Sequence, residues 1–323
     1  MTQVAPDIWR ILLPTPWPVG PVNAYLIDDD PLTLIDTGAW DTPTVTALES
    51  GLRACGYEVA NLERIVLSHQ HIDHWGLAPH LAQRSGAEIC ALAELAPWLA
   101  AYPGSLARED QFADDLLERH GADPAVSGAG VYRGDADYGA SVHVTHRLND
   151  GDVLEFSHRR LITFHRPGHS PSDTVFCDLE RGAMIGADHV MPKPSVPILS
   201  PPLSGPDVAR RPRALADYRA SLTATQAMDL DLILPGDGDV VTAPRAVIAE
   251  RLAGYDRMTE RVQAALDDEP HTAIEIAAQA RRRITVASAF YVLCDTLGYL
   301  DQLLDAGAVV EVQDDRVSQF ARA

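Results

Sequence analysis

The sequence predicts an α/β protein, in which short apolar strands alternate with helices, followed by a smaller helical unit. Aliphatic runs such as Ile65-Val66-Leu67 recur at strand length between stretches with helical spacing of apolar residues. The 323 residues exceed the roughly 250–300 at which a single hydrophobic core stops growing. Beyond about residue 250 the composition changes and helical spacing dominates. We therefore predict one domain over residues 1–250 and a second over residues 251–323.

The first half of the chain is typical of a hairpin followed by alternating helices and strands. Two apolar runs flank Asp28-Asp29-Asp30-Pro31, a turn sequence, and predict paired strands. A long acidic region that follows has helical spacing with proline and glycine breakers, and we expect it to cover the mouth of a site. In order, the predicted elements are strands at 24–27 and 32–35, a helix at 43–55, a strand at 65–67, a helix at 76–85, a strand at 87–92 and mostly helix from 94 to 121.

The second half returns to strands and then to helices. The segment 191–206 has six prolines in sixteen residues, which predicts an ordered loop rather than a helix or strand. Three C-terminal helices and a short strand favour a small winged-helix-like unit. The predicted elements are strands at 153–156, 161–164, 174–177 and 183–186, a helix at 207–226, a strand at 230–234, helices at 258–266, 274–281 and 288–304, and a strand at 309–312.

The charge argues against anionic partners. The chain has 46 acidic and 26 basic residues, a formal net charge of −20, so nucleic acid and anionic membrane surfaces are repelled on average. Residues 256–323 hold seven basic and twelve acidic residues, a net of 7 − 12 = −5, which favours packing, dimerisation or pocket shaping over DNA binding. We expect no nucleic-acid or membrane partner and leave a homodimer open.

The N-terminal sequence and the lack of a long apolar segment predict an intracellular protein. The N-terminal sequence lacks a basic stretch followed by an apolar run, and no segment has the roughly 18 apolar residues of a membrane span. The four cysteines form no C-x-x-C pair, and we expect buried free thiols. The predicted location is the cytoplasm.

The strongest chemical signal is Ser68-His69-Gln70-His71-Ile72-Asp73-His74, which directly follows a predicted strand. Side chains alternate along an extended chain, so His69 and His71 project to the same side and can reach one metal ion. Asp73 and His74 follow one turn later, aimed at a neighbouring position. Imidazole and carboxylate ligands suit zinc, iron or manganese. A solvated histidine-rich turn is the alternative, but such a density of ligand types is rare outside metal sites.

Further candidate ligands follow three other predicted strands. His169 stands in Pro167-Gly168-His169, Asp188 in Gly186-Ala187-Asp188, and Asp237 in Pro235-Gly236-Asp237-Gly238. Glycine beside these residues lets the backbone turn sharply and approach an ion. Each position alone is a weak signal, but together with the first cluster they predict one metal centre.

With these residues in place, the chain resembles the metallo-β-lactamase superfamily, whose His-x-His-x-Asp-His signature is matched by residues 69–74. The resemblance covers roughly residues 7–245 and implies an αββα sandwich, the metallo-β-lactamase fold, with the site at one edge. It implies one ion held by His69, His71 and His169, a second held by Asp73 and His74, and Asp188 bridging both. Asp36 matches an aspartate that usually supports the ligands without binding metal.

One position departs from the family pattern. Relatives with two ions usually read Pro-Gly-His-Gly where this chain reads Pro235-Gly236-Asp237-Gly238. If Asp237 is a ligand, the second position becomes richer in carboxylates, which shifts its preference from zinc toward manganese or iron. If it is not, the enzyme runs on one ion. We favour ligation, because a carboxylate is a competent ligand, and expect two divalent ions with zinc as the main candidate.

The C-terminal helices resemble those of a branch called lactamase-beta-2-like, whose members are described as hydrolases of thioesters and other activated acyl compounds, some acting on RNA. The predicted function is hydrolysis of an ester, thioester or lactone-type acyl bond in a small molecule by metal-bound hydroxide, with Asp73 as the catalytic residue that orients the hydroxide or passes its proton on. The alternatives are a phosphodiesterase or nuclease, a redox iron enzyme, and a metal-binding protein without turnover. We expect His165 and His189 to lie outside the ligand set.

Overall fold

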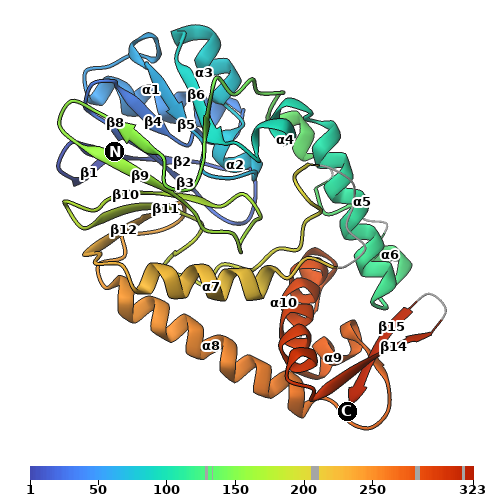
Figure 1. Ribbon diagram of the computed structural model, residues 1–323. Coiled ribbons are helices and arrows are strands. Elements are labelled where there is room, and N and C mark those ends of the chain that lie inside the picture. The colour runs from blue at the N-terminus through green and yellow to red at the C-terminus, as the bar shows by residue number, and fades with distance from the viewer. Residues whose placement is uncertain (128–129, 133, 205–210, 281–283, 315–316) are drawn as a thin grey trace.

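The structure is a computed structural model that describes residues 1–127, 130–132, 134–204, 211–280, 284–314 and 317–323. Two sheets face each other, with helices on their outer faces (Figure 1). The first has the order β1-β2-β3-β4-β5-β6-β7, antiparallel from β1 to β4 and parallel from β4 to β7. Its strands are β1 Thr2–Ala5, β2 Ile8–Leu13, β3 Val22–Ile27, β4 Thr33–Ile35, β5 Arg64–Val66, β6 Glu88–Leu92 and β7 His146–Leu148.

The second sheet has the order β12-β11-β10-β9-β8, in which β11 and β12 are parallel and the other neighbours antiparallel. Its strands are β8 Val153–Glu155, β9 Arg160–His165, β10 Thr174–Asp178, β11 Ala183–Ala187 and β12 Leu232–Pro235. Buried side chains such as Tyr25 and Val66 from the first sheet and Phe176 and Ile185 from the second share one hydrophobic cluster. This cluster between the sheets is the centre of the sandwich.

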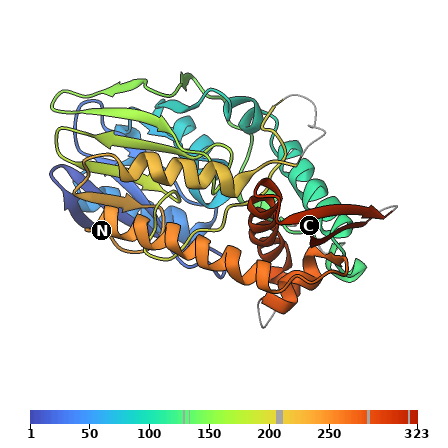
Figure 2. The same cartoon turned by 60° about the horizontal axis from the view of Figure 1, so that its bottom comes forward.

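The helices cover both outer faces, which makes the sandwich αββα. Helices α1 and α3 pack against the first sheet, and α7 and α8 lie along the second, as Figure 2 shows from below. The helical segments are α1 Thr42–Ala54, η1 Val59–Asn61, α2 Ile72–Trp75, α3 Ala78–Ser85, α4 Ala96–Ala100, α5 Gly104–Arg119, α6 Pro124–Ser127, η2 Asp135–Tyr138, α7 Ala214–Gln226, α8 Pro244–Ala264, α9 Ala273–Ala280 and α10 Val286–Asp305.

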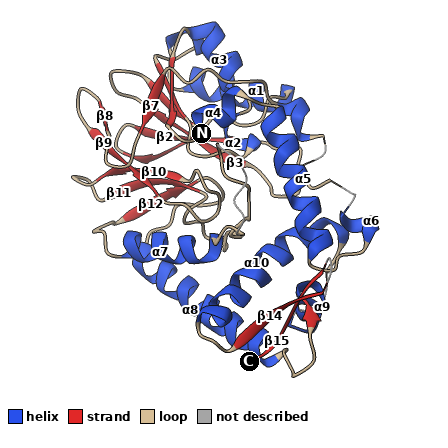
Figure 3. Cartoon of the chain, turned by 45° about the vertical axis from the view of Figure 1, so that its right-hand side comes forward, coloured by secondary structure: helices blue, strands red, loops and turns tan. Residues whose placement is uncertain are grey.

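The C-terminal part combines α9 and α10 with a small sheet of order β13-β15-β14 (Figure 3). Its strands are β13 His271–Thr272, β14 Val309–Asp314 and β15 Val317–Arg322. The predicted boundary between residues 250 and 251 falls inside α8. One hydrophobic cluster joins Val175 and Ile233 of the sandwich to Leu293 and Phe320 of the C-terminal part. The likeness of these elements to a winged helix stays a prediction.

The strands and helices agree with the predictions in most places, and the differences have physical causes. Helix α7 begins at Ala214 rather than at 207, because Pro212 disfavours helical backbone in the residue before it; residues 207–210 lie outside the described part. The prediction lacked β1, β2 and β7, which are short or carry polar residues. The helix predicted over 76–85 is α3, and the prediction lacked the short α2 before it.

Helix α5 connects the sandwich to the C-terminal part. It leaves α4 beside the first sheet and ends next to β15, so one side of the molecule is spanned by a single helix (Figure 1). Its buried side chains face both units, with Leu106 in the core of the first sheet and Leu117 in the C-terminal cluster. Among the helices that the structure describes, none has the length and apolarity that crossing a bilayer requires.

Candidate metal centre

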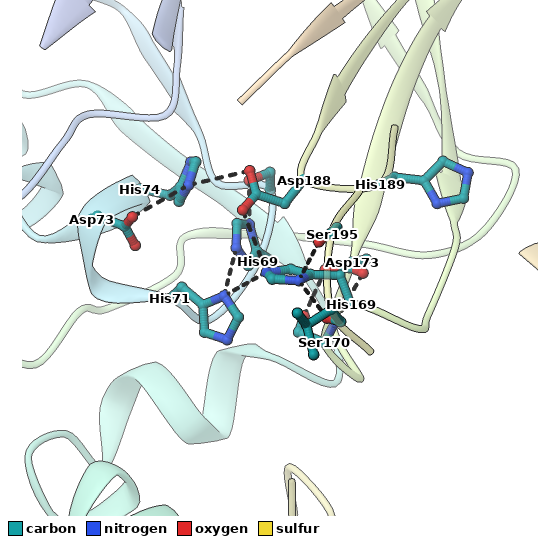
Figure 4. A network of polar contacts seen from close by, with 12 residues as sticks. His69, His71, Asp73, His74, His169, Ser170, Asp173, Asp188, His189 and Ser195 are labelled. Carbon is teal, nitrogen blue, oxygen red and sulfur yellow. Dashed lines mark hydrogen bonds and ion pairs between the residues drawn. The ribbon is translucent and has the colours of Figure 1, made fainter. Parts of the chain in front are cut away.

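Three strand ends bring candidate ligands together at one edge of the sandwich (Figure 4). The loop after β5 carries His69 and His71, and the short helix α2, capped by His71, carries Asp73 and His74. His169 follows β9, and Asp188 follows β11. Ligand-type atoms of His69, His71, His169 and Asp188 all lie within 4.8 Å of one another. Residues up to 119 positions apart in the sequence thus form one cluster, as 188 − 69 = 119.

Three imidazole nitrogens converge at the first position. His71 Nδ1 lies 3.0 Å from His69 Nε2 and 2.9 Å from His169 Nε2. His169 Nδ1 lies 3.0 Å from the carbonyl oxygen of Val196, which can only accept, so the proton sits on Nδ1 and the lone pair of Nε2 faces the cluster. Converging lone pairs repel one another unless a cation lies among them. The donor set therefore fits a divalent metal ion.

His69 has the same tautomer for a similar reason. Ser68 Oγ donates to Asp36 Oδ2 at 2.7 Å, which leaves the lone pairs of the serine oxygen free to accept from His69 Nδ1 at 2.9 Å. The Nε2 lone pair of His69 then points into the cluster. Burial, followed by the neighbouring His74 ring, lowers the pKa of His69 well below its ordinary value. A neutral imidazole is the form that binds metal.

A second position lies on the other side of Asp188. One carboxylate oxygen of Asp188, Oδ2, is 3.3 Å from His169 Nε2, and the other, Oδ1, is 3.5 Å from His74 Nε2. Asp73 Oδ2 lies 3.8 Å from the same His74 nitrogen. Among the described residues, His74 Nε2 and Asp188 Oδ1 are buried without a hydrogen-bond partner, which is costly unless an ion satisfies them. Asp188 therefore lies between the two groups of residues, with one carboxylate oxygen toward His169 and the other toward His74.

Asp36 fixes the ring of His74. Its Oδ2 lies 3.1 Å from His74 Nδ1, and its Oδ1 accepts the backbone N–H of Ser68 at 2.9 Å. His74 is buried, which alone would lower its pKa, but the carboxylates of Asp188, Asp73 and Asp36 outweigh burial and raise the pKa well above its ordinary value. Asp36 has a φ of 57°, a left-handed conformation that aspartate tolerates better than most residues. Its contacts fit the supporting role that the resemblance implies.

Asp237 lies beside this second position. Gly236 is so close that a Cβ there would collide with Asp188 Oδ1 and lie 2.8 Å from His74 Cε1. Asp237 Oδ1 is buried without a hydrogen-bond partner among the described residues. Burial and the neighbouring Asp188 raise the pKa of Asp237 to about 7. The two carboxylates therefore lie close enough to interact, and ligation of a metal by Asp237 stays a prediction.

The other histidines considered in the sequence lie outside the cluster. His189 Nε2 bonds Thr225 Oγ1 at 2.8 Å, and its ring points away from Asp188 (Figure 4). His165 Nε2 bonds the carbonyl oxygen of Pro171 at 2.8 Å.

Glu109 was not predicted from the sequence; it is 3% exposed and contacts Gln70, which lies between His69 and His71. Its position in the sequence could have indicated a buried role, because Glu109 lies on the apolar face that Leu106, Ala113 and Leu116 form on α5.

Comparison with known proteins decides the family. The model of the metallo-beta-lactamase superfamily matches residues 17–237, more than half of the chain. The chain belongs to the metallo-beta-lactamase superfamily. The match ends at Asp237 and includes each candidate ligand. The lactamase-beta-2-like branch stays a prediction.

Superfamily relatives match along almost the whole chain. A Bacillus subtilis protein named "Probable metallo-hydrolase YqjP" is 29% identical over 320 residues, 97% of each chain. The crystal structure of a beta-lactamase domain protein from Burkholderia ambifaria has a TM-score of 0.84 at 26% identity, with 100% of this chain and 94% of that one covered. A metallo-beta-lactamase family protein from Thermus thermophilus, TTHA1429, has a TM-score of 0.80 at 23% identity and covers 99% of this chain and 100% of its own. The shared fold therefore includes the C-terminal part.

Proposed function

We propose that the protein is a metal-dependent hydrolase that cleaves an ester, thioester or lactone-type acyl bond in a small molecule. The observation that carries the proposal is the convergence of imidazole lone pairs and buried carboxylate oxygens from separate strand ends. The superfamily membership and the name of the Bacillus subtilis relative, a metallo-hydrolase, support the same reaction class.

One ion would be held by His69, His71 and His169, and the other by Asp73, His74 and Asp237. Asp188 would contribute to both. Divalent ions there would supply a Lewis acid for the acyl carbonyl and lower the pKa of water to about 7. Three imidazoles suit zinc at the first position, whereas the carboxylates around His74 also suit manganese or iron at the second. We propose two ions per chain.

Asp73 is the residue that we assign to proton handling. Its Oδ2 lies 3.8 Å from His74 Nε2, and in the metal-free protein burial raises the pKa of its carboxyl group. Its side chain keeps 19% of its surface exposed, so a water molecule can reach it. Asp73 would orient the attacking water by a hydrogen bond and take up its proton.

The residues around Asp73 favour an uncharged acyl group over a phosphodiester. Asp135 lies close enough to Asp73 for the two carboxylates to interact, and its Oδ1 accepts the Trp17 indole N–H at 2.9 Å. The rings of Trp17 and Tyr138 meet edge to face, with their centroids 4.9 Å apart. Carboxylate and aromatic side chains next to Asp73 would disfavour a phosphate and favour an apolar acyl chain.

A substrate panel tests the proposal. The metal-loaded protein is assayed with activated esters, acyl thioesters, lactones and an activated phosphodiester, before and after EDTA. We expect acyl hydrolysis that EDTA abolishes and added metal restores, a loss of at least about 100-fold in His71→Ala, and unchanged rates in His143→Ala, an exposed histidine outside the cluster. Faster cleavage of the phosphodiester than of every acyl compound, or activity that survives both EDTA and His71→Ala, would overturn it.

A further inference from the structure

Helix α5 buries a carboxylate against the loop that carries two of the candidate ligands. Glu109 is 3% exposed and lies on the apolar face of the helix between Leu106 and Ala113. Burying a carboxylic acid costs free energy unless hydrogen bonds compensate, so its presence on an apolar face calls for a partner. Nothing in the proposed chemistry uses this residue.

The partner is the side chain between His69 and His71. Glu109 Oε1 accepts a hydrogen bond from Gln70 Nε2 at 2.5 Å and from the Trp98 indole N–H at 3.1 Å. With its Nε2 bound in this way, Gln70 uses its Oε1 to accept from Ser172 Oγ at 2.8 Å. The amide group of Gln70 is thereby held from both ends.

The backbone of Gln70 is held as well. Its N–H lies 3.0 Å from Ser172 Oγ, and its carbonyl oxygen accepts the indole N–H of Trp75 at 2.8 Å. The loop between β5 and α2 therefore has one fixed conformation at the residue that separates the two histidines. Side chains at alternate positions share one face only if the residue between them is oriented away, as Gln70 is.

We propose that Glu109 is a positioning residue, which acts through Gln70 to hold His69 and His71 in the geometry that binds metal. The proposal rests on the assignment of these histidines as ligands in the proposed function. Partners outside the ligand set typically change metal affinity by about 10–100-fold when they are removed. Helix α5, from the region predicted to cover the site, would thus be part of the metal centre's framework.

The neighbouring Asp110 supplies a matched control. Its Oδ1 accepts the backbone N–H of Tyr132 at 3.0 Å, so it fastens a different segment, the one that leads to η2. Asp110→Ala removes a carboxylate and a hydrogen bond from the same helix without touching the ligand loop. A general effect of disturbing α5 would appear in both variants, whereas positioning of the ligands would appear in Glu109 variants alone.

The test measures zinc affinity of the full chain by competition with a chromophoric chelator, together with Tm. Glu109→Leu leaves Gln70 Nε2 and Trp98 Nε1 unpaired, and we expect zinc affinity about 10–100-fold below wild type. Glu109→Gln keeps an acceptor oxygen at the same place, and Asp110→Ala leaves the contacts of the loop between β5 and α2 unchanged. Both variants should therefore bind zinc like wild type. Should Glu109→Leu fail to fold, Glu109→Asp, which is too short to reach Gln70, replaces it.

A double variant tests the route through Gln70. Gln70→Leu should lose as much zinc affinity as Glu109→Leu, and the pair together should lose no more than either alone. Wild-type affinity in Glu109→Leu, or an equal loss in Asp110→Ala, would overturn the positioning role and leave the hydrolase proposal standing. If wild type itself bound no zinc or other divalent ion, both would fail.

Discussion

The backbone at Gly236 packs directly against the side chains of Asp188 and His74. A Cβ at this residue would collide with Asp188 Oδ1 and lie 2.8 Å from His74 Cε1. We therefore expect Gly236→Ala to displace one of these side chains, to lose the second equivalent of metal and to lose most activity. Gly104→Ala is the control, since no described atom lies within 4 Å of its Cβ. Metal analysis and Tm of both variants check this, and two equivalents in Gly236→Ala would contradict it.

Asp237 gives the metal-free protein a pH dependence of known sign. Burial, then Asp188, raise its pKa in the folded state from 3.8 to about 7. Between these values the folded protein holds a proton that the unfolded chain has lost, so this group's contribution to stability falls as the pH rises toward 7. In chelator, Asp237→Asn should therefore have a higher Tm than wild type at pH 8, and the difference should shrink toward pH 4.

Metal should reverse that order. With manganese or zinc present at pH 8, a bound ion should raise the Tm of wild type more than that of Asp237→Asn, because the variant lacks one ligand. Melting curves from pH 4 to 8, with chelator and with metal, measure both effects. A difference in Tm that is the same at every pH would show that Asp237 does not titrate in this range. A difference that is the same with and without metal would show that Asp237 does not bind an ion.

At the scale of elements, strand ends were the predictable part of the site. The sequence places His69, His169 and Asp188 within a few residues of the end of apolar runs. The residues that follow a strand lie at the edge of its sheet, so their position can be predicted from the strand alone. The seven-stranded sheet was harder to predict, since β7 holds three residues including His146 and Arg147, and its pairing with β6 depends on residues more than fifty positions away.

Packing between distant helices was not predictable. Arg211 and Arg213, before α7, both pair with Asp301 near the end of α10, and such ion pairs leave no spacing pattern in the sequence. The contact of Glu109 with Gln70 is of the same kind. An acid on the apolar face of a predicted helix indicates a buried partner, but the periodicity does not say which residue that partner is.

Two helical glycines form a matched pair that tests the packing of α10 on α7. A Cβ at Gly298 would lie 2.6 Å from Leu215 Cβ. A Cβ at Gly254 on α8 would lie 3.7 Å from its nearest neighbour, Arg257 Nη2 at the end of a flexible side chain. Alanine gains about 1 kcal/mol of helix propensity at either site. We expect Gly254→Ala to raise Tm and Gly298→Ala to be less stable than Gly254→Ala by about 1–3 kcal/mol because of the clash. Equal stability of the two variants would contradict the packing.

At the scale of the whole molecule, one buried cluster runs from β10 and β12 through α7 and α8 to α10 and β15. The second domain predicted for residues 251–323 therefore shares its core with the first, and α8 crosses the boundary without a break. This arrangement leaves the metal centre at the sandwich edge, with α5 reaching from its ligand loop to the C-terminal part. The hydrolytic chemistry is local, but its framework extends through most of the chain.

The measurement that tests the central claim most directly is the metal content of the full chain, purified without chelator and dialysed against zinc or manganese. The claim is that side chains from separate strand ends hold two divalent ions. It predicts two equivalents per chain in wild type, a lower content in His71→Ala, and one equivalent in Asp237→Ala. One equivalent or less in wild type, or an unchanged content in His71→Ala, would contradict it.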